Sequence, residues 1–138
     1  MPLVVDSSFM VSLVVHEEHS AFAHACLLEH DSEPRVAPAL MAWETANVLW
    51  RKTRRGEIDG EQRLEMLGSL AEFETTLEPP QPDVTLALLA YADLLRLTAY
   101  DAAYLEMAMR LEAQLATLDR PLTLAALAEG LVVHSPFA

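Results

Sequence analysis

The sequence predicts an α/β domain with a central, mostly parallel sheet that is flanked by helices on both faces. Short apolar runs rich in β-branched residues, typical of buried parallel strands, alternate with longer segments of helical periodicity. Strands separated by helical segments form βαβ units, which place helices on both faces of a parallel sheet. The chain has 138 residues and no internal repeat or long linker, so we expect a single domain over residues 1–138.

The first half of the chain predicts two strands and three helices. Residues 2–6 (PLVVD) form a short apolar strand that ends in Asp-Ser-Ser, a favourable helix start. The run RVAP, between Pro34 and Pro38, predicts a second strand, and Gly56 closes the long helix that follows it. The three helices are expected at residues 8–15, 19–31 and 39–55.

The second half predicts four helices and two strands. Gly60 opens one helix, and the prolines of residues 79–82 break the chain before the next. LATLD (115–119) and LVVH (131–134) are the expected strands, and Gly130 ends the helix between them. The four helices are expected at residues 60–74, 83–97, 101–114 and 122–129.

Two acidic residues end predicted strands. Asp6 closes the first strand and Asp119 closes LATLD. In open parallel sheets the functional crevice lies outside the carboxyl ends of the strands. The predicted fold therefore points to Asp6 and Asp119 as candidate functional residues.

Composition and N-terminal sequence predict a cytoplasmic protein without a membrane segment. Hydrophobic residues make up 52% of the chain, yet no uninterrupted apolar run approaches the roughly 18 residues that a bilayer span requires. MPLVVDSS lacks the positive patch and cleavage site of a secretory signal. Cys26 is the only cysteine and cannot form an intramolecular disulfide, which favours a reducing compartment.

The charge balance argues against a general electrostatic attraction to nucleic acid. Nine Lys and Arg against 21 Asp and Glu give a net charge of −12. Four of the nine basic residues nevertheless fall together, at Arg51, Lys52, Arg54 and Arg55. They are either the favourable C-terminus of a helix or a local patch that contacts RNA or a partner protein.

Each of four acids has an ordinary explanation when it is taken alone. Asp6 and Asp101 could cap helices, Asp119 could start a turn before a proline, and Glu44 could be solvated. For Asp101, helical periodicity changes this interpretation, because at 100° per residue it lies in line with Leu105. A carboxylate on an apolar stripe is costly unless it is protonated, hydrogen-bonded or bound to a cation. For Glu44 the sequence leaves open which side of the helix is buried.

Convergence of these acids would imply a metal. Mutual repulsion raises carboxylate pKa values and destabilises the site unless divalent cations compensate. All-carboxylate sites select hard cations, Mg²⁺ or as a substitute Mn²⁺, over Zn²⁺. Such ions activate a water and stabilise the entering and leaving oxygens of phosphodiester hydrolysis, which is the predicted reaction class.

Three polar residues are candidates to support the acids. Ser7 and Thr117 lie close in sequence to strand-end acids and could orient a carboxylate or a water. Asn47 could hydrogen-bond Glu44 or the substrate. The plain alternatives are that Ser7 caps the first helix and that Asn47 is an exposed helical residue.

These residues together resemble a PIN-domain nuclease, in particular a VapC-type toxin of a toxin–antitoxin pair. The matching pieces are VVDSS, the segment from Glu44 to Asn47, YDAAYLEMA (100–108) and TLDRPL (117–122), in the family's order. The resemblance implies a PIN-like domain with Mg²⁺-dependent endoribonuclease activity, a cognate antitoxin that occludes the acidic site, and a homodimer.

The resemblance also assigns roles to the acids. It implies that Asp6, Asp101 and Asp119 are the metal-binding aspartates and that Glu44 is the remaining acid of the catalytic site. The charge of −12 departs from what RNA binding favours, and the basic run at 51–55 is the natural compensating patch.

Other readings account for the sequence less well. A phosphatase with Asp6 as nucleophile would need a second Asp two positions on, where Ser8 stands. His16-Glu17-Glu18-His19 is one residue short of the zinc metalloprotease motif. A non-catalytic interaction module that binds a partner through an apolar surface remains the alternative. Trp43 and Trp50, seven residues apart on one helix, are expected in the core, with a protein interface as the alternative.

Overall fold

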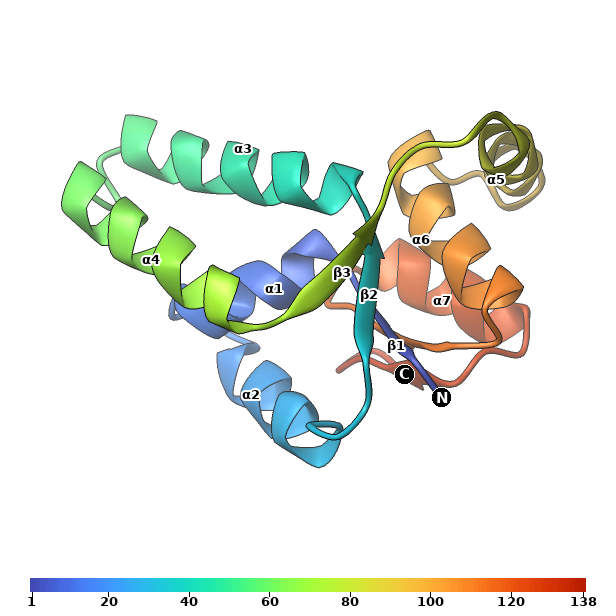
Figure 1. Ribbon diagram of the computed structural model, residues 1–138, viewed down its shortest axis with the longest axis horizontal. Coiled ribbons are helices and arrows are strands. Elements are labelled where there is room, and N and C mark those ends of the chain that lie inside the picture. Colours follow the sequence, from blue (N-terminus) through green and yellow to red (C-terminus); the bar gives the residue numbers. More distant parts are fainter.

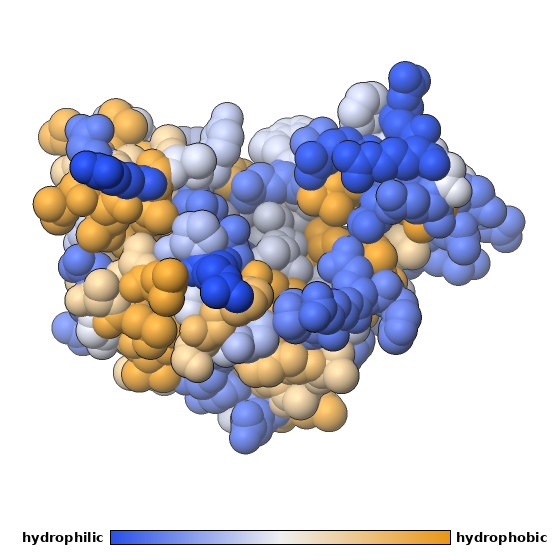
Figure 2. Space-filling model, turned by 180° about the vertical axis from the view of Figure 1, so that it is seen from behind, coloured by the Kyte–Doolittle hydropathy of each residue, from blue (hydrophilic) through white to orange (hydrophobic).

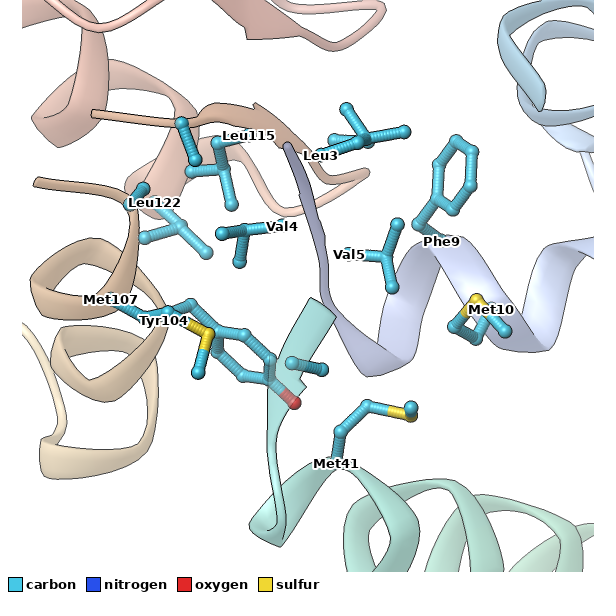
Figure 3. Packing of buried hydrophobic residues seen from close by; sticks show 14 of the residues in the cluster. Leu3, Val4, Val5, Phe9, Met10, Met41, Tyr104, Met107, Leu115 and Leu122 are labelled. Atoms are coloured by element: carbon cyan, nitrogen blue, oxygen red, sulfur yellow. The ribbon is translucent and has the colours of Figure 1, made fainter. Parts of the chain in front are cut away.

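The strand LVV lies at the centre of the sheet because its residues have no polar side chain to hydrate. The computed structural model describes residues 1–138. Leu3, Val4 and Val5 are fully buried in it. Val4 pairs in parallel with Val36 on one side and with Leu115 on the other. Both neighbours continue the hydrophobic core, which Figure 3 shows around this strand.

All five strands are parallel, in the order β3-β2-β1-β4-β5. In Figure 1, helices α1 to α4 lie on one side of the sheet and α5 to α7 on the other. The α/β prediction is therefore confirmed. No helix has both the length and the apolar character needed to cross a membrane.

The strands are β1 (Leu3–Val5), β2 (Arg35–Pro38), β3 (Thr75–Glu78), β4 (Gln114–Ala116) and β5 (Val133–His134). The helices are α1 (Ser7–Val14), α2 (Ser20–Glu29), α3 (Leu40–Arg54), α4 (Gly60–Glu72), α5 (Pro82–Leu95), α6 (Ala99–Arg110) and α7 (Arg120–Ala128).

The prediction that Asp101 begins a helix is wrong by two residues. Helix α6 starts at Ala99 because Thr98 is its cap, and the Thr98 side chain accepts a hydrogen bond from the Asp101 backbone N–H at 3.1 Å. The helix also ends at Arg110, not near Gln114, because Glu112 adopts a left-handed φ of 50° and Gln114 enters β4.

Strand β3 was not predicted from the sequence. Its residues, TTLE, fall between the helix expected at residues 60–74 and the proline break of residues 79–82, a stretch to which no element was assigned. The strand forms at the edge of the sheet, where it pairs with all four residues of β2. An edge strand needs no continuous apolar run, so its local sequence carries little signal.

Both tryptophans lie on the surface, contrary to the prediction that they belong to the core. Trp43 is 78% exposed and Trp50 is 52% exposed. Helix α3 instead buries Met41, Thr45 and Leu49, a stripe at four-residue spacing. The burial of this smaller stripe turns the tryptophans outward, so they are free to contact a partner.

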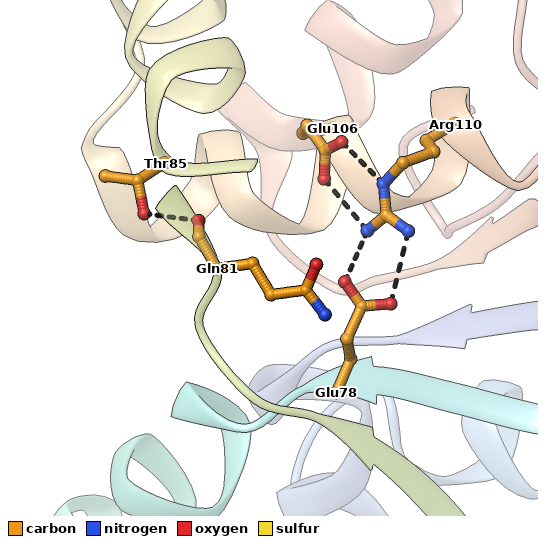
Figure 4. A network of polar contacts seen from close by, with 5 residues as sticks. All are labelled: Glu78, Gln81, Thr85, Glu106 and Arg110. Atoms are coloured by element: carbon orange, nitrogen blue, oxygen red, sulfur yellow. Dashed lines mark hydrogen bonds and ion pairs between the residues drawn. The ribbon is translucent and has the colours of Figure 1, made fainter. Parts of the chain in front are cut away.

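Arg110 bridges two carboxylates and so connects the edge strand to α6. Arg110 binds Glu106 at 2.7 Å and Glu78, the last residue of β3, at 2.6 Å (Figure 4). Only 5% of the Glu106 side chain is exposed. The two carboxylates raise the pKa of Arg110, so its guanidinium stays charged.

Candidate active site

Asp6 is held rigidly at the carboxyl end of β1. Its Oδ1 caps α1 by accepting from the Phe9 N–H at 2.9 Å, and it also accepts from the Ser8 hydroxyl at 2.7 Å. Its Oδ2 accepts from the Thr117 hydroxyl, across the strand pair. Asp6 is 4% exposed, and burial outweighs these hydrogen bonds, so the pKa of Asp6 is raised to about 6. The side chain is both a helix cap and a buried carboxylate.

Asp119 is linked to Asp6 by hydrogen bonds to the same residue, Thr117. The backbone N–H of Asp119 donates to Thr117 Oγ1 at 3.0 Å, and the same hydroxyl donates to Asp6. Asp119 Oδ2 accepts from the Leu122 N–H at 2.9 Å and caps α7. This cap uses one carboxylate oxygen, so Oδ1 is available to a ligand.

Glu44 is fixed by a tyrosine from the opposite side of the sheet. The Tyr104 hydroxyl donates to Glu44 Oε1 at 2.5 Å, which joins α3 to α6. Figure 3 shows the Tyr104 ring in the core with its hydroxyl directed towards the start of α3. Burial raises the pKa of Glu44 despite this hydrogen bond. The interpretation of Glu44 as a simply solvated residue is therefore wrong.

Asp101 stands half-buried in the first turn of α6. Leu105 and Ala108, which share its stripe, are fully buried, as helical periodicity predicted. Burial, together with the charges of Asp119 and Glu44, raises the pKa of Asp101 to about 6. The carboxylate therefore faces other acids at the edge of the core.

The structure brings the four predicted acids together. The charge of Asp119 raises the pKa of Asp6, Glu44 and Asp101 alike, so Asp119 lies close enough to act on all three. No three of these acids hold their oxygens within 4.8 Å of one another. The donor set is all-oxygen and loose, which fits Mg²⁺ or Mn²⁺, since these hard ions keep several water ligands and need few carboxylates.

Of the three polar residues predicted to support the acids, Thr117 and Ser7 lie next to an acid and Asn47 does not. Thr117 is fully buried and bonds Asp6, and Ser7 lies close enough to Glu44 to lower its pKa. Asn47 is exposed and makes no hydrogen bond to Glu44. Ser8 was not predicted to support the site, yet its hydroxyl bonds Asp6 and accepts from the Leu118 N–H at 3.0 Å.

Tyr104 is a second residue that sequence reasoning did not assign to the site. Its spacing of three residues from Asp101 places both on one face of α6, and that is the available signal. The sequence offers no indication that a residue on α3 accepts a hydrogen bond from its hydroxyl.

The basic run lies at the far end of α3 and is partly neutralised. Lys52 pairs with Glu17 at 3.4 Å and with Glu57 at 3.3 Å. Arg51, Arg54 and Arg55 are exposed, and the Arg54 guanidinium lies 5.6 Å from the centre of the Trp50 ring. In Figure 2 strongly hydrophilic residues occupy this end of the molecule, at the upper right.

We expect Mg²⁺ or Mn²⁺ to stabilise the protein more at pH 7.5 than at pH 5. Asp6 and Asp101 have pKa values raised to about 6, so folding of the metal-free chain is most favourable below their ordinary pKa and loses stability as pH rises through 6. A bound cation offsets the cost of these buried negative charges only when the acids are ionised. At ten times Kd the expected rise in Tm is about 5 °C at pH 7.5 and clearly smaller at pH 5.

The measurement is a thermal melt with and without each ion. Asp93→Asn is a matched control, because Asp93 is an exposed aspartate on α5. It should keep the full rise, whereas Asp101→Asn should lose most of it. A rise of the same size at both pH values would contradict binding at these acids.

Comparison with known proteins gives a consistent result. The family model described as PIN domain matches residues 3–127. Ribonuclease VapC3 from Pyrobaculum aerophilum is 36% identical over 132 residues, which cover 88% of this chain and 92% of that protein.

Solved structures are similar over nearly the whole chain. The Pyrobaculum aerophilum protein PAE2754 is 25% identical with a TM-score of 0.70, covering 96% of this chain and 83% of that one. VapC20 from Mycobacterium tuberculosis, a toxin that cleaves the sarcin-ricin loop, is 16% identical with a TM-score of 0.68, and the match covers 94% and 96%. VapBC2 from Rickettsia felis, solved with a fragment of promoter DNA, is 11% identical with a TM-score of 0.72 and 98% coverage of both chains. The last two similarities concern the fold alone.

Proposed function

Because the chain belongs to the PIN domain family and is a VapC-type member of it, we propose that it is an endoribonuclease that uses Mg²⁺ or Mn²⁺ and acts as the toxin of a toxin–antitoxin pair. The observation that carries this proposal is the group of four acids around Asp119, contributed by the ends of two strands and by two helices. The name of Ribonuclease VapC3 supports RNA as the substrate.

Each acid has a role in this proposal. Asp6, Asp101 and Asp119 would hold the ion, and Glu44 is the remaining acid of the site. When bound, the cation supplies an activated water and charge stabilisation for phosphodiester hydrolysis. Thr117 and Ser8 fix both oxygens of Asp6, so this carboxylate needs no reorganisation to act as a ligand.

Tyr104 has a positioning role. Its hydroxyl donates to Oε1 of Glu44, next to Ser7, and so fixes the orientation of this carboxylate towards water or substrate. Burial of the tyrosine and its hydrogen bond to Glu44 raise the Tyr104 pKa, so the phenol stays protonated and remains a donor.

The proposal is tested by incubating the purified, partner-free protein with a panel of structured RNAs. Cleavage is expected with Mg²⁺ or Mn²⁺ and should stop when EDTA removes the ion. The products should be internal fragments, as an endonuclease makes. A well-folded protein that cleaves no RNA with either ion would contradict the proposal.

The exposed arginines of α3 are proposed to attract RNA. Arg51→Ala/Arg54→Ala should weaken RNA binding several-fold and lower the slope of log K against log salt by about 1.4, since each lost phosphate contact on a single strand removes about 0.7. Fluorescence anisotropy at several salt concentrations measures both. Arg96→Ala removes an exposed arginine at the end of α5 and should change neither value. An unchanged slope in the double variant would show that the run is only a helix terminus.

A cognate antitoxin and a second copy of the chain are the proposed protein partners. A groove of about 300 Å³ between α3, α4 and β3 is lined mainly by apolar side chains, including Met41 and Phe73. On the other side, Leu86 and Leu94 of α5 are about three-quarters exposed, and hydrophobic residues gather there in Figure 2, at the upper left. Sedimentation of the free chain and of the chain with its antitoxin distinguishes dimer from complex.

These exposed apolar surfaces also favour one alternative, a non-catalytic interaction module of the same fold. Exposed tryptophans and leucines are typical of protein interfaces. The module predicts partner binding without RNA cleavage in the free protein. The cleavage experiment therefore separates the two functions.

A further inference from the structure

A second group of potential metal ligands lies away from the acids. Cys26 lies on α2, His30 follows it by four residues as the C-cap of that helix, and His134 is the last residue of β5. One ligand atom from each of the three lies within 4.8 Å of the others. The centres of the His30 and His134 imidazole rings lie 4.3 Å apart, with the ring planes tilted by 48°.

A glutamine holds His134 in the form that binds a metal. The Gln114 amide nitrogen donates to Glu33 and, at 3.4 Å, to the carbonyl of Met1, so the Gln114 Oε1 faces His134 as an acceptor. His134 Nε2 lies 2.7 Å from this oxygen and carries the proton. The lone pair then resides on Nδ1. This arrangement is the usual support of a metal-bound histidine, whose second ring nitrogen donates to a fixed oxygen.

The other two residues of the cluster, His30 and Cys26, are also free to bind an ion. His30 Nδ1 is buried and forms no hydrogen bond; its nearest carboxylate oxygen, Glu33 Oε1, lies 3.3 Å away and forms an ion pair with the ring only when the ring is protonated. Cys26 is 5% exposed. Burial, with the charges of Glu29 and Glu33, raises the pKa of its thiol to about 11, so in the absence of an ion the sulfur stays protonated. Burial and the neighbouring His30 lower the pKa of His134, which keeps its ring neutral.

We propose that Cys26, His30 and His134 bind one transition-metal ion in tetrahedral geometry, with Zn²⁺ as the physiological ion and Glu33 or water in the fourth position. A thiolate and two imidazoles select Zn²⁺ over Mg²⁺, so this site and the acids differ in ion. Binding releases the thiol proton to solvent as the S–Zn bond forms. The ligand atoms must close by about 1 Å to reach bonding distances, which rotation of the two partly exposed histidines allows.

An occupied site would fasten α2 to the last strand of the sheet. These elements come from opposite ends of the chain, so the ion would act as a cross-link between them. The proposal concerns the fold and does not depend on RNA cleavage.

Cobalt spectroscopy of the whole protein tests this site without interference from the acids. Cys26 is the only cysteine, so any thiolate-to-Co²⁺ charge-transfer band in the near ultraviolet must come from it. We expect this band, together with visible bands of tetrahedral Co²⁺, when Co²⁺ is added to the reduced protein. Zn²⁺ should displace Co²⁺ and abolish both. Absence of the charge-transfer band at saturating Co²⁺ would overturn the proposal.

Variants then identify the histidine ligands. His30→Gln and His134→Gln should each weaken Zn²⁺ binding, measured by loss of the cobalt band, by at least about tenfold. His24→Gln is the matched control, because His24 is exposed on the same helix. It should keep the affinity and spectrum of the parent protein. Unchanged affinity in both His30→Gln and His134→Gln would also overturn the site.

Discussion

Asp101→Asn is expected to lower the rate of metal-dependent RNA cleavage by at least about 100-fold. Asp101 is the acid whose pKa responds both to Asp119 and to Glu44, so its charge is coupled to the rest of the group. Asparagine keeps the shape and the half-buried position but removes the charge that would hold the ion. The measurement is single-turnover cleavage at saturating Mg²⁺, which separates chemistry from product release.

The same experiment on Asp6→Ala/Asp101→Ala tests whether the acids act as one unit. If they hold the same ion, the double variant should be little slower than the slower of the two single variants. Asp93→Asn again serves as a control for the loss of one exposed negative charge and should cleave at the parent rate. More than a tenth of the parent rate in a well-folded Asp101→Asn would remove Asp101 from the site.

Arg110→Met is expected to lower the free energy of unfolding by about 2–3 kcal/mol. The substitution leaves the nearly buried Glu106 carboxylate and that of Glu78 facing each other without a cation (Figure 4). The expected cost is below the 3–5 kcal/mol or so of a fully buried pair, because 36% of the Arg110 side chain meets solvent. Urea denaturation gives the value, with the m-value as a check on two-state unfolding.

A compensating variant distinguishes charge from packing. Glu106→Leu/Arg110→Met removes both the buried charge and its partner, and it should recover most of the lost stability. Arg55→Met, which removes an exposed arginine at the end of α3, should change stability by less than about 0.5 kcal/mol. If Arg110→Met costs as little as Arg55→Met, the contact to Glu106 contributes no more than a surface ion pair.

The helix caps explain why the acids could be recognised and yet misread. Asp6 and Asp119 do cap helices, as their local sequence indicates, and they also belong to the acidic group. A parallel sheet places the start of the next helix at the carboxyl end of a strand, where ligands bind. The two readings were treated as alternatives, but the fold makes them compatible.

The sequence by itself determined the alternation of strands and helices, the parallel sheet, and the positions of Asp6 and Asp119 at strand ends. These features follow from local periodicity, capping residues and proline or glycine breaks, which act over a few residues. Membership of Asp101 in an apolar stripe was determined in the same way.

Only the tertiary structure decided which distant groups meet. The edge strand β3 forms through pairing with β2, and burial of Met41 and Leu49 turns the tryptophans of α3 outward. The bond from Tyr104 to Glu44 and the meeting of Cys26 with His134 likewise join segments far apart in the chain. Local propensity carries no information about such contacts, because their free energy depends on burial and partners that exist only after the sheet has assembled.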